Sequence, residues 1–242
     1  MNNMTPSTAS EKKLIKSIQA AIGAAQDGIL GPASAVDLAV EVGADCWPVT
    51  IKLYDMPVIV CEDITVSNPG KGCKHFANSI SGSFSYQKKP CSILVNNGQA
   101  QHLSACHAWL GQPESVLYRR KDGTFGIKRC LSAGQLPADV KWAVGGMGLL
   151  NMYNPETEGF TGQYADVLRD TNHTVLGVKR GMVYLVYCKS MTGRQVNEFC
   201  RDKLQLDYAI MLDGGHVAAI NGEESFAKVN TAQVQYYLIQ GV

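Results

Sequence analysis

The chain has 242 residues with a net charge of +1, and 45% of its residues are hydrophobic. This composition is typical of a globular protein with one substantial core, and the balanced charge excludes the basic surface of a nucleic-acid-binding protein. No run approaches the ~18 apolar residues of a membrane-spanning helix. The polar first residues, MNNMTPSTASEKK, lack the apolar centre of a signal peptide, so we expect no membrane partner and a cytoplasmic location in the producing cell.

Eight cysteines are scattered through the chain without a CxxC pair, and we expect reduced thiols rather than a disulfide framework. The segments Cys73–His75 and His102–His107 contain residue types that bind zinc, and His102 and Cys106 would share one face of a helix. No second pair of ligands accompanies them, so the sequence predicts no metal site.

Two short helices are predicted near the N-terminus. Residues Thr8–Glu11 have the spacing of a capping box, and Pro32 suits the first position of the second helix. The segments 17–23 and 26–34 resemble the core of a peptidoglycan-binding repeat, which implies a wall-binding segment over residues 1–44. Because about forty residues bury too little apolar surface to fold alone, the alternative is a helical hairpin that braces the main domain.

Residues 45–242 are predicted to form one α+β domain, a mixed β-sheet flanked by helices. Strands are expected over residues 47–54 and 58–66, and a turn at Asp122–Gly126 leads into a further strand. Residues 151–163 form a polar, aromatic loop, which could reach over a site or be an ordinary exposed connection.

A strand–helix–strand unit follows in the last third of the chain. Val175–Val178 and Met182–Cys188 are typical of a hairpin, and Thr192 with Gln195 fits a capping box for the next helix. A right-handed crossover would make Met182–Cys188 parallel to the apolar run that ends at Leu212.

This topology makes Asp213 a candidate site residue. It would lie at the carboxyl end of a parallel strand, where open sheets bind ligands, and Gly214 and Gly215 leave their backbone N–H groups accessible. Asp-Gly is also ordinary turn chemistry, so a purely structural role stays open.

Residues from about 93 to 241 resemble the phosphodiester glycosidase family in the order and spacing of its motifs. The family's closing Leu-Asp-Gly-Gly-Gly-Ser-like segment is matched by Leu212–Gly215, with His216 in place of the third glycine. Its middle segment, His-Pro-Arg-Thr-Ala-hydrophobic-Gly, is matched by residues 172–177, which keep the His, Thr and Gly but lack the Arg. Residues 94–98 and 142–150 resemble the family's Asn-Gly-Gly-like turn and its glycine-rich segment.

The resemblance implies hydrolysis of an N-acetylglucosamine-type sugar 1-phosphodiester. Since the phosphate is already a good leaving group, a carboxylate has only to activate water or stabilise positive charge on the anomeric carbon. Asp213 is the candidate for this role, and His173 for proton transfer or phosphate binding. The residues expected to hold phosphate or sugar hydroxyls are Asn96, Asn97, Gly98, Gly145, Gly146, Thr174, Gly214, Gly215 and His216.

The peptidoglycan-binding-like segment and the polar start of the chain suggest a biological setting. The substrate would be a sugar phosphate or a cell-wall or capsular glycopolymer, and the protein a phage-encoded lysis or wall-modifying protein, released at lysis or attached to the virion. No cofactor is expected, although a divalent cation at Asp213 would replace base catalysis by Lewis-acid stabilisation.

Plainer interpretations stay open. Asn97 and Gly98 could turn a hairpin, His173 could end a loop, and His216 could be a half-buried strand residue. The alternative function is a binding protein that captures a phosphorylated sugar or nucleotide-like ligand without turnover. The missing Arg and His216 in place of the third glycine favour binding, while the intact Asp213–Gly215 segment favours hydrolysis.

Overall fold

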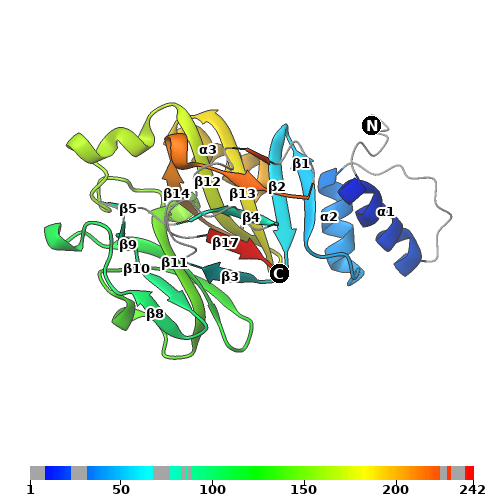
Figure 1. Ribbon diagram of the computed structural model, residues 1–242, viewed down its shortest axis with the longest axis horizontal. Helices are drawn as coiled ribbons and strands as arrows, with labels where there is room; N and C mark the ends of the chain where they lie inside the picture. The colour runs from blue at the N-terminus through cyan, green and yellow to red at the C-terminus, as the bar shows by residue number, and fades with distance from the viewer. Residues whose placement is uncertain are drawn as a thin grey trace.

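The computed structural model describes residues 9–22, 32–67, 77–82, 85–86, 89–223, 228–229 and 238–242. A large β-sheet dominates these residues (Figure 1). Its strand order is β1 (Val49–Leu53), β2 (Met56–Cys61), β13 (Met182–Met191), β12 (Thr171–Lys179), β14 (Tyr208–Gly214), β11 (Val140–Gly148), β7 (Leu94–Asn96) and β8 (Gln99–His102). β9 (Glu114–Arg120) pairs with β11, and β10 (Phe125–Cys130) pairs with β9.

A smaller sheet covers one face of the large one. Its order is β16 (Lys228–Val229), β15 (Ile220–Asn221), β4 (Ser79–Ser81), β17 (Leu238–Gly241) and β3 (Ile64–Ser67), and a separate pair joins β5 (Ser85–Tyr86) to β6 (Lys89–Pro90). Apolar side chains of both sheets form one cluster, in which Ile80, Ile220 and Ile239 meet residues such as Leu176 and Ile210.

Helices pack on the opposite face. They are α1 (Ala9–Ile22), α2 (Pro32–Glu41), α3 (Gly193–Glu198) and the π-helical turn η5 (Phe199–Leu204). Short 3-10 turns join the strands: η1 (Ala108–Leu110), η2 (Ala133–Gln135), η3 (Leu150–Met152), η4 (Gly162–Leu168) and η6 (Gly215–Val217). The predicted α+β class is therefore confirmed. No helix of the described ranges is long and apolar enough to cross a membrane.

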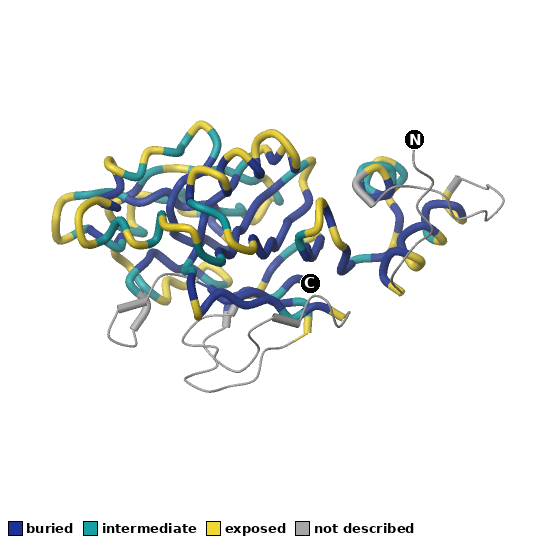
Figure 2. The backbone as a smooth tube through the Cα atoms, turned by 90° about the horizontal axis from the view of Figure 1, so that it is seen from above, coloured by how far each residue is buried: buried dark blue, intermediate teal, exposed yellow. Residues whose placement is uncertain are grey.

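The central strands are apolar along almost their whole length because both faces of the large sheet are covered. β12 and β13 are buried almost throughout, because helices cover one face of the sheet and the smaller sheet covers the other. Figure 2 shows the buried residues gathered in the interior of the main body, with exposed residues mostly at the turns around it. Continuous apolar runs of this kind indicate burial on both faces. They do not fix strand direction: every pairing recorded in the two larger sheets is antiparallel, where we expected a mixed sheet.

The predicted crossover is present with one difference. β12 pairs antiparallel with both β13 and β14, so β13 and β14 run in the same direction but β12 lies between them. Asp213 therefore lies near the end of β14 as expected, beside an antiparallel neighbour. The predicted capping box is confirmed, since Thr192 accepts a hydrogen bond from the Gln195 N–H and Gln195 accepts one from the Thr192 N–H.

The predicted strand over residues 58–66 is split into β2 and β3 at Glu62–Asp63. Asp63 accepts hydrogen bonds from the Ile64 N–H and the Trp142 indole, and it also contacts Lys141. Burial tends to raise the pKa of this carboxyl, but the bonds from Lys141 and Trp142 outweigh it and hold the pKa below its ordinary value. A charged carboxylate thus marks the point where the chain passes from one sheet to the other.

The N-terminal helices share the core of the main sheet. Leu14, Ile18 and Val36 belong to the same apolar cluster as residues of β1, β2 and β13, and Figure 1 shows α1 and α2 beyond β1. An ion pair between Asp37 of α2 and Lys179 of β12 adds a polar contact at 3.0 Å. The capping box expected at Thr8 lies outside the described residues. The two helices therefore pack on the main sheet and contribute to its core.

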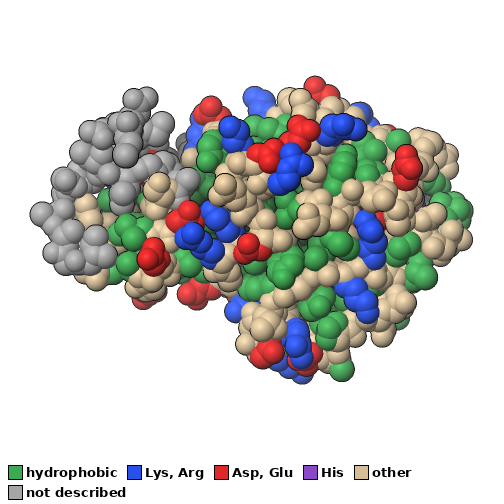
Figure 3. Space-filling model, turned by 180° about the vertical axis from the view of Figure 1, so that it is seen from behind, with side chains coloured by type: hydrophobic (Ala, Val, Ile, Leu, Met, Phe, Trp, Pro, Cys, Tyr) green, Lys and Arg blue, Asp and Glu red, His purple; other side chains and the backbone are tan. Residues whose placement is uncertain are grey.

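Acidic and basic side chains are interspersed over the face opposite to that of Figure 1 (Figure 3). This distribution agrees with the balanced composition of 22 Lys and Arg against 21 Asp and Glu residues.

We expect the Ile18→Ala variant to lower the free energy of unfolding of the whole protein by about 2–5 kcal/mol, because Ile18 is fully buried in the shared core. Urea unfolding followed by fluorescence should show one cooperative transition at lower urea. The exposed Lys16→Ala variant on the same helix is the control. An unchanged main transition in Ile18→Ala would show that the helices are an independent module.

Candidate functional site

Asp213, Gly214 and Gly215 lie where β14 ends beside the beginning of β12. His173 of β12 is paired with Gly214 of β14 in the sheet register, and the pairing shifts between His173 and Val175. The structure therefore brings together five residues predicted separately from two motifs: Asp213, Gly214, Gly215, His173 and Thr174. Asp213 is half-buried, and its carboxylate accepts the N–H of Gly214 at 2.9 Å.

Thr174 fixes the backbone of this group. Its buried hydroxyl lies 3.2 Å from the carbonyl oxygen of Asp213 and 3.3 Å from that of Ser81. Ser81 belongs to β4 and also bonds to Ala219, beyond the glycines. Thr174 thus ties the candidate site to the smaller sheet, and in this structure its hydroxyl points into protein rather than toward solvent.

His173 is fully buried in the structure. Its Nε2–H donates to the carbonyl oxygen of Met191 at 2.8 Å, and Nδ1 has no hydrogen-bond partner among the described residues. Burial lowers the pKa of the imidazole from its ordinary value. A neutral, enclosed imidazole can position β12 against β14, but it does not reach a ligand directly. The expected role in proton transfer or phosphate binding therefore requires a different conformation from the one observed.

A guanidinium group lies beside the second glycine. A Cβ atom built on Gly215 would be 3.4 Å from Nη2 of Arg169 and 3.9 Å from the Thr171 hydroxyl. Arg169 contacts Asp166 through Nη1 and is about half exposed. The motif comparison missed this residue, because Arg169 precedes His173 by four positions instead of following it. Only the folding of residues 169–171 toward Gly215 shows that a basic group is present here.

His216 follows in η6 and is exposed. It is therefore placed to meet solvent or a ligand near Gly215, rather than being a half-buried strand residue.

The predicted residues Asn96, Asn97 and Gly98 lie elsewhere in the sheet. Asn97 and Gly98 both have positive φ and connect β7 to β8, the geometry of a type I′ hairpin turn. The Gly98 N–H donates to the carbonyl oxygen of Lys141 at 2.7 Å, and the Asn96 side chain donates to the carbonyl oxygen of Val66. The turn interpretation explains these residues, and their role in binding stays a prediction.

Gly145 and Gly146 serve close packing around β11. A side chain at Gly145 would overlap the carboxyl group of Glu114, and one at Gly146 would lie 2.6 Å from the carbonyl oxygen of Met211 in β14. These glycines let β11 approach its neighbours, and β11 pairs with β14 through Met147 and Met211. They support the strand that carries Asp213 from the side opposite β12.

No group of three or more His, Cys, Asp or Glu residues suited to a metal ion is found in the described part of the chain. Of the zinc-ligand types noted in the sequence, His102 bonds through Nδ1 to the carbonyl oxygen of Ser92. Cys73 and His75 lie outside the described residues.

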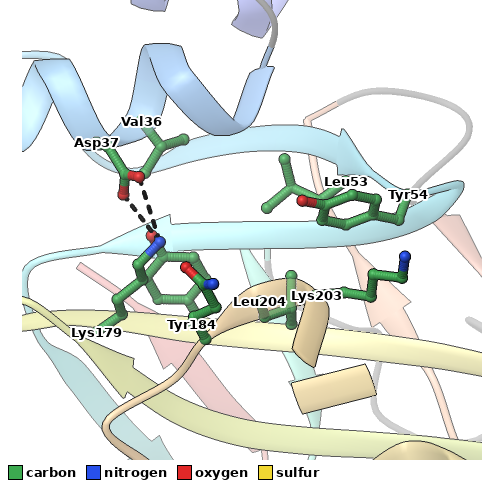
Figure 4. A pocket seen from close by; sticks show the side chains of 9 residues that line it. Val36, Asp37, Leu53, Tyr54, Lys179, Tyr184, Lys203 and Leu204 are labelled. Carbon is green, nitrogen blue, oxygen red and sulfur yellow. Dashed lines mark hydrogen bonds and ion pairs between the residues drawn. The ribbon is translucent and has the colours of Figure 1, made fainter. Parts of the chain in front are cut away.

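A separate cavity of about 80 Å³ lies between α2, the β1–β2 turn and the end of η5 (Figure 4). Its walls include Asp37, Lys179, Tyr184 and Lys203, and none of the predicted site residues lines it. Lys179 ends β12 whereas His173 is near its start, so six residues of strand, roughly 20 Å, separate the two regions. The cavity and the Asp213 group are therefore different places on the fold.

The fold of the two sheets with their covering helices resembles that of a phosphodiester glycosidase catalytic domain. The chain is similar to the catalytic domain of zebrafish N-acetylglucosamine-1-phosphodiester alpha-N-acetylglucosaminidase, auto-inhibited by its pro-peptide. The TM-score is 0.57 at 15% sequence identity, over 81% of this chain and 82% of that one. A hypothetical protein from Synechocystis is similar with a TM-score of 0.52 at 11% identity, over 79% of this chain and 61% of that chain.

The sequence itself matches no family model and no curated protein. At such low identities the structural likeness establishes the fold and leaves the activity to be tested. The resemblance of residues 17–34 to a peptidoglycan-binding repeat receives no support from these comparisons.

We expect acid to destabilise the protein partly through His173. The pKa of His173 in the folded protein lies below the ordinary value of 6.5, so the unfolded chain binds the proton more tightly than the folded protein does. The stabilising contribution is complete above pH 6.5 and is lost as the pH falls toward the lower folded pKa. A His173→Gln variant, which can still donate to Met191, should lose less unfolding free energy between pH 7.5 and 5 than the wild type in urea titrations.

The exposed His216→Gln variant is the control for this comparison. An identical pH dependence in wild type and His173→Gln would contradict a neutral, buried His173. The other histidines are present in both the wild type and His173→Gln, so their contributions cancel when the two pH dependences are subtracted.

Proposed function

We propose that the protein is a hydrolase that cleaves a sugar 1-phosphodiester of the N-acetylglucosamine type. The observation that carries the proposal is the half-buried Asp213 at the end of β14, with glycines and a guanidinium group beside it, on a glycosidase-like fold. A carboxylate, a backbone without side chains in the way and a cation are groups that can carry out the hydrolysis of a sugar phosphate.

In this proposal Asp213 activates water or stabilises positive charge on the anomeric carbon. The Gly214 N–H bond to the Asp213 carboxylate fixes the orientation of that group. Arg169 binds the phosphate in place of the Arg that is absent from the middle motif, and the glycine backbone allows the phosphate to approach. His173 acts as a positioning residue through β12, and the exposed His216 lies next to Gly215, where it can contact a bound ligand.

A polymer substrate fits the same chemistry. We propose a cell-wall or capsular glycopolymer as the natural substrate class and a phage-encoded lysis or wall-modifying role, with the protein made in the cytoplasm and released at lysis or carried by the virion. The resemblance of residues 17–34 to a peptidoglycan-binding repeat supports this setting. A divalent cation beside Asp213 is an extension of the proposal, since a carboxylate and phosphate oxygens are ligands that Mg²⁺ accepts.

One observation favours a second candidate, a protein that captures a phosphorylated sugar or nucleotide-like ligand without turnover. His173, the histidine expected to move protons, is enclosed and bonded to the carbonyl oxygen of Met191. In this conformation the middle motif supplies no group that can transfer a proton to a ligand at Asp213. Tight binding without product release would support this candidate.

We expect Asp213→Asn to reduce turnover of UDP-N-acetylglucosamine, used as a sugar phosphodiester, by roughly 10²–10⁴-fold. Loss of the negative charge removes both the base and the electrostatic stabiliser, while the amide keeps the shape of the side chain. Release of free N-acetylglucosamine is the measurement, made with and without EDTA. The Asp55→Asn variant, changed in the exposed β1–β2 turn, is the control.

Equal rates for wild type and Asp213→Asn would place the reaction elsewhere. If the folded wild type releases no sugar but binds the nucleotide sugar tightly in calorimetry, the binding function replaces the hydrolase.

We expect Arg169→Gln to raise KM or Kd for the same substrate about 10- to 100-fold, because a charge-assisted hydrogen bond to phosphate contributes roughly 1.5–3 kcal/mol. The matched control is Arg201→Gln: both arginines are 55% exposed on their side chains and paired with a nearby aspartate. Equal effects of the two substitutions would show that Arg169 has no specific contact with phosphate.

A further inference from the structure

Two of the cysteines lie together beside β7. The Sγ atoms of Cys91 and Cys106 are 3.2 Å apart, although the residues are 15 positions apart in the sequence. Both are partly exposed, whereas the other described cysteines are buried: Cys46, Cys61, Cys130, Cys188 and Cys200. A disulfide bond is ~2.05 Å long, so a movement of about 1 Å brings these thiols to bonding distance.

One buried side chain holds both cysteine segments. The carboxyl group of Glu114, which is 1% exposed, accepts the N–H of Cys106 at 3.1 Å and the N–H of Ile93, two residues beyond Cys91. A backbone bond from Ala105 to Leu131 fixes the same loop. These bonds hold the two segments that carry the cysteines next to each other.

His107 places a base next to one of the thiols. Its Nδ1–H donates to the carbonyl oxygen of Glu158 at 2.8 Å, which leaves a lone pair on Nε2, 3.9 Å from Cys106 Sγ. The pKa of the Cys106 thiol is raised by its contact with Cys91 and by burial, and His107 opposes this rise. The imidazole can accept the thiol proton as Cys106 becomes a nucleophile.

We propose that Cys91 and Cys106 form a redox-active dithiol that a low-molecular-weight disulfide, such as oxidised glutathione, converts reversibly to a disulfide. His107 accepts the Cys106 proton, and the thiolate attacks one sulfur of the glutathione disulfide and releases one glutathione. Cys91 then gives up its proton and attacks Cys106 Sγ, which releases the second glutathione. Two protein thiols are oxidised by two electrons, one glutathione disulfide is reduced, and the two thiol protons pass to the two glutathione thiolates.

The disulfide would close the loop from Cys91 to Cys106 and restrain the segment that leads into η1. His107 in this segment packs its ring against Phe160 and Tyr164, at ring-centroid distances of 5.0 and 4.8 Å. Tyr164 belongs to η4, which ends one residue before Arg169. Oxidation therefore stabilises a part of the structure adjoining the candidate site, and the chemistry of the pair does not depend on the proposed hydrolase activity.

The test treats the folded full chain with oxidised glutathione, blocks the remaining thiols by alkylation and maps peptides without reduction. The wild type should yield a Cys91–Cys106 disulfide peptide, and its Tm should rise by roughly 6–12 °C, as expected for closure of a loop of about 15 residues. Dithiothreitol should reverse both changes. The Cys91→Ser variant should carry glutathione on Cys106 with no such rise in Tm, and the buried Cys46→Ala variant should behave like the wild type.

A Cys91–Cys106 disulfide that forms only in urea would overturn the proposal, as would an unchanged Tm after its formation. The same holds if Cys106→Ser shows the wild-type rise in Tm. Since no substrate is present, the result is separate from the outcome of the hydrolysis assay.

Discussion

The close approach of Gly214 to His173 is the contact on which the candidate site depends. A Cβ atom at position 214 would lie 2.8 Å from the carbonyl oxygen of Asn172 and 3.0 Å from Nδ1 of His173, so any side chain would push β14 away from β12. With glycine there, the imidazole is enclosed between the strands and bonded to Met191. Asp213 is consequently held at a fixed distance from β12, with its carbonyl oxygen bound by Thr174.

Buried polar side chains do similar work elsewhere in the fold. Glu158 is 1% exposed and accepts hydrogen bonds from Ser115, Arg129 and the Gly148 N–H. Glu114 joins the segments that carry the two neighbouring cysteines. In each case a carboxyl group satisfies donors of segments that are distant in the sequence, which is the condition for burying a polar group without a large cost. Hydrogen bonds to Glu114 and Glu158 thereby connect loops around the large sheet to its strands.

Much of the fold could be predicted from the sequence. Apolar runs located the central strands, and the Thr192–Gln195 spacing located a helix start, because both signals are local. The strand order could not be predicted in the same way, since burial on both faces makes parallel and antiparallel strands look alike. The break at Asp63 also escaped prediction, because it depends on Lys141 and Trp142, nearly eighty positions away.

The candidate site shows the same division. Asp213, its two glycines and the middle motif were found from the sequence, and the structure places them side by side. Arg169 was missed because its position relative to the motif differs, and only the tertiary structure brings it to Gly215. Asn97 and Gly98 were selected by a pattern that a hairpin turn also satisfies, and their backbone angles are those of the turn.

The most direct test of this account is a crystal structure of the Asp213→Asn variant with bound UDP-N-acetylglucosamine. The account predicts phosphate oxygens within hydrogen-bonding distance of Arg169 and of the backbone at Gly214–Gly215, with the anomeric carbon facing residue 213. A nucleotide sugar bound instead in the cavity near Asp37 and Lys179, with the Asp213 region unchanged, would contradict it.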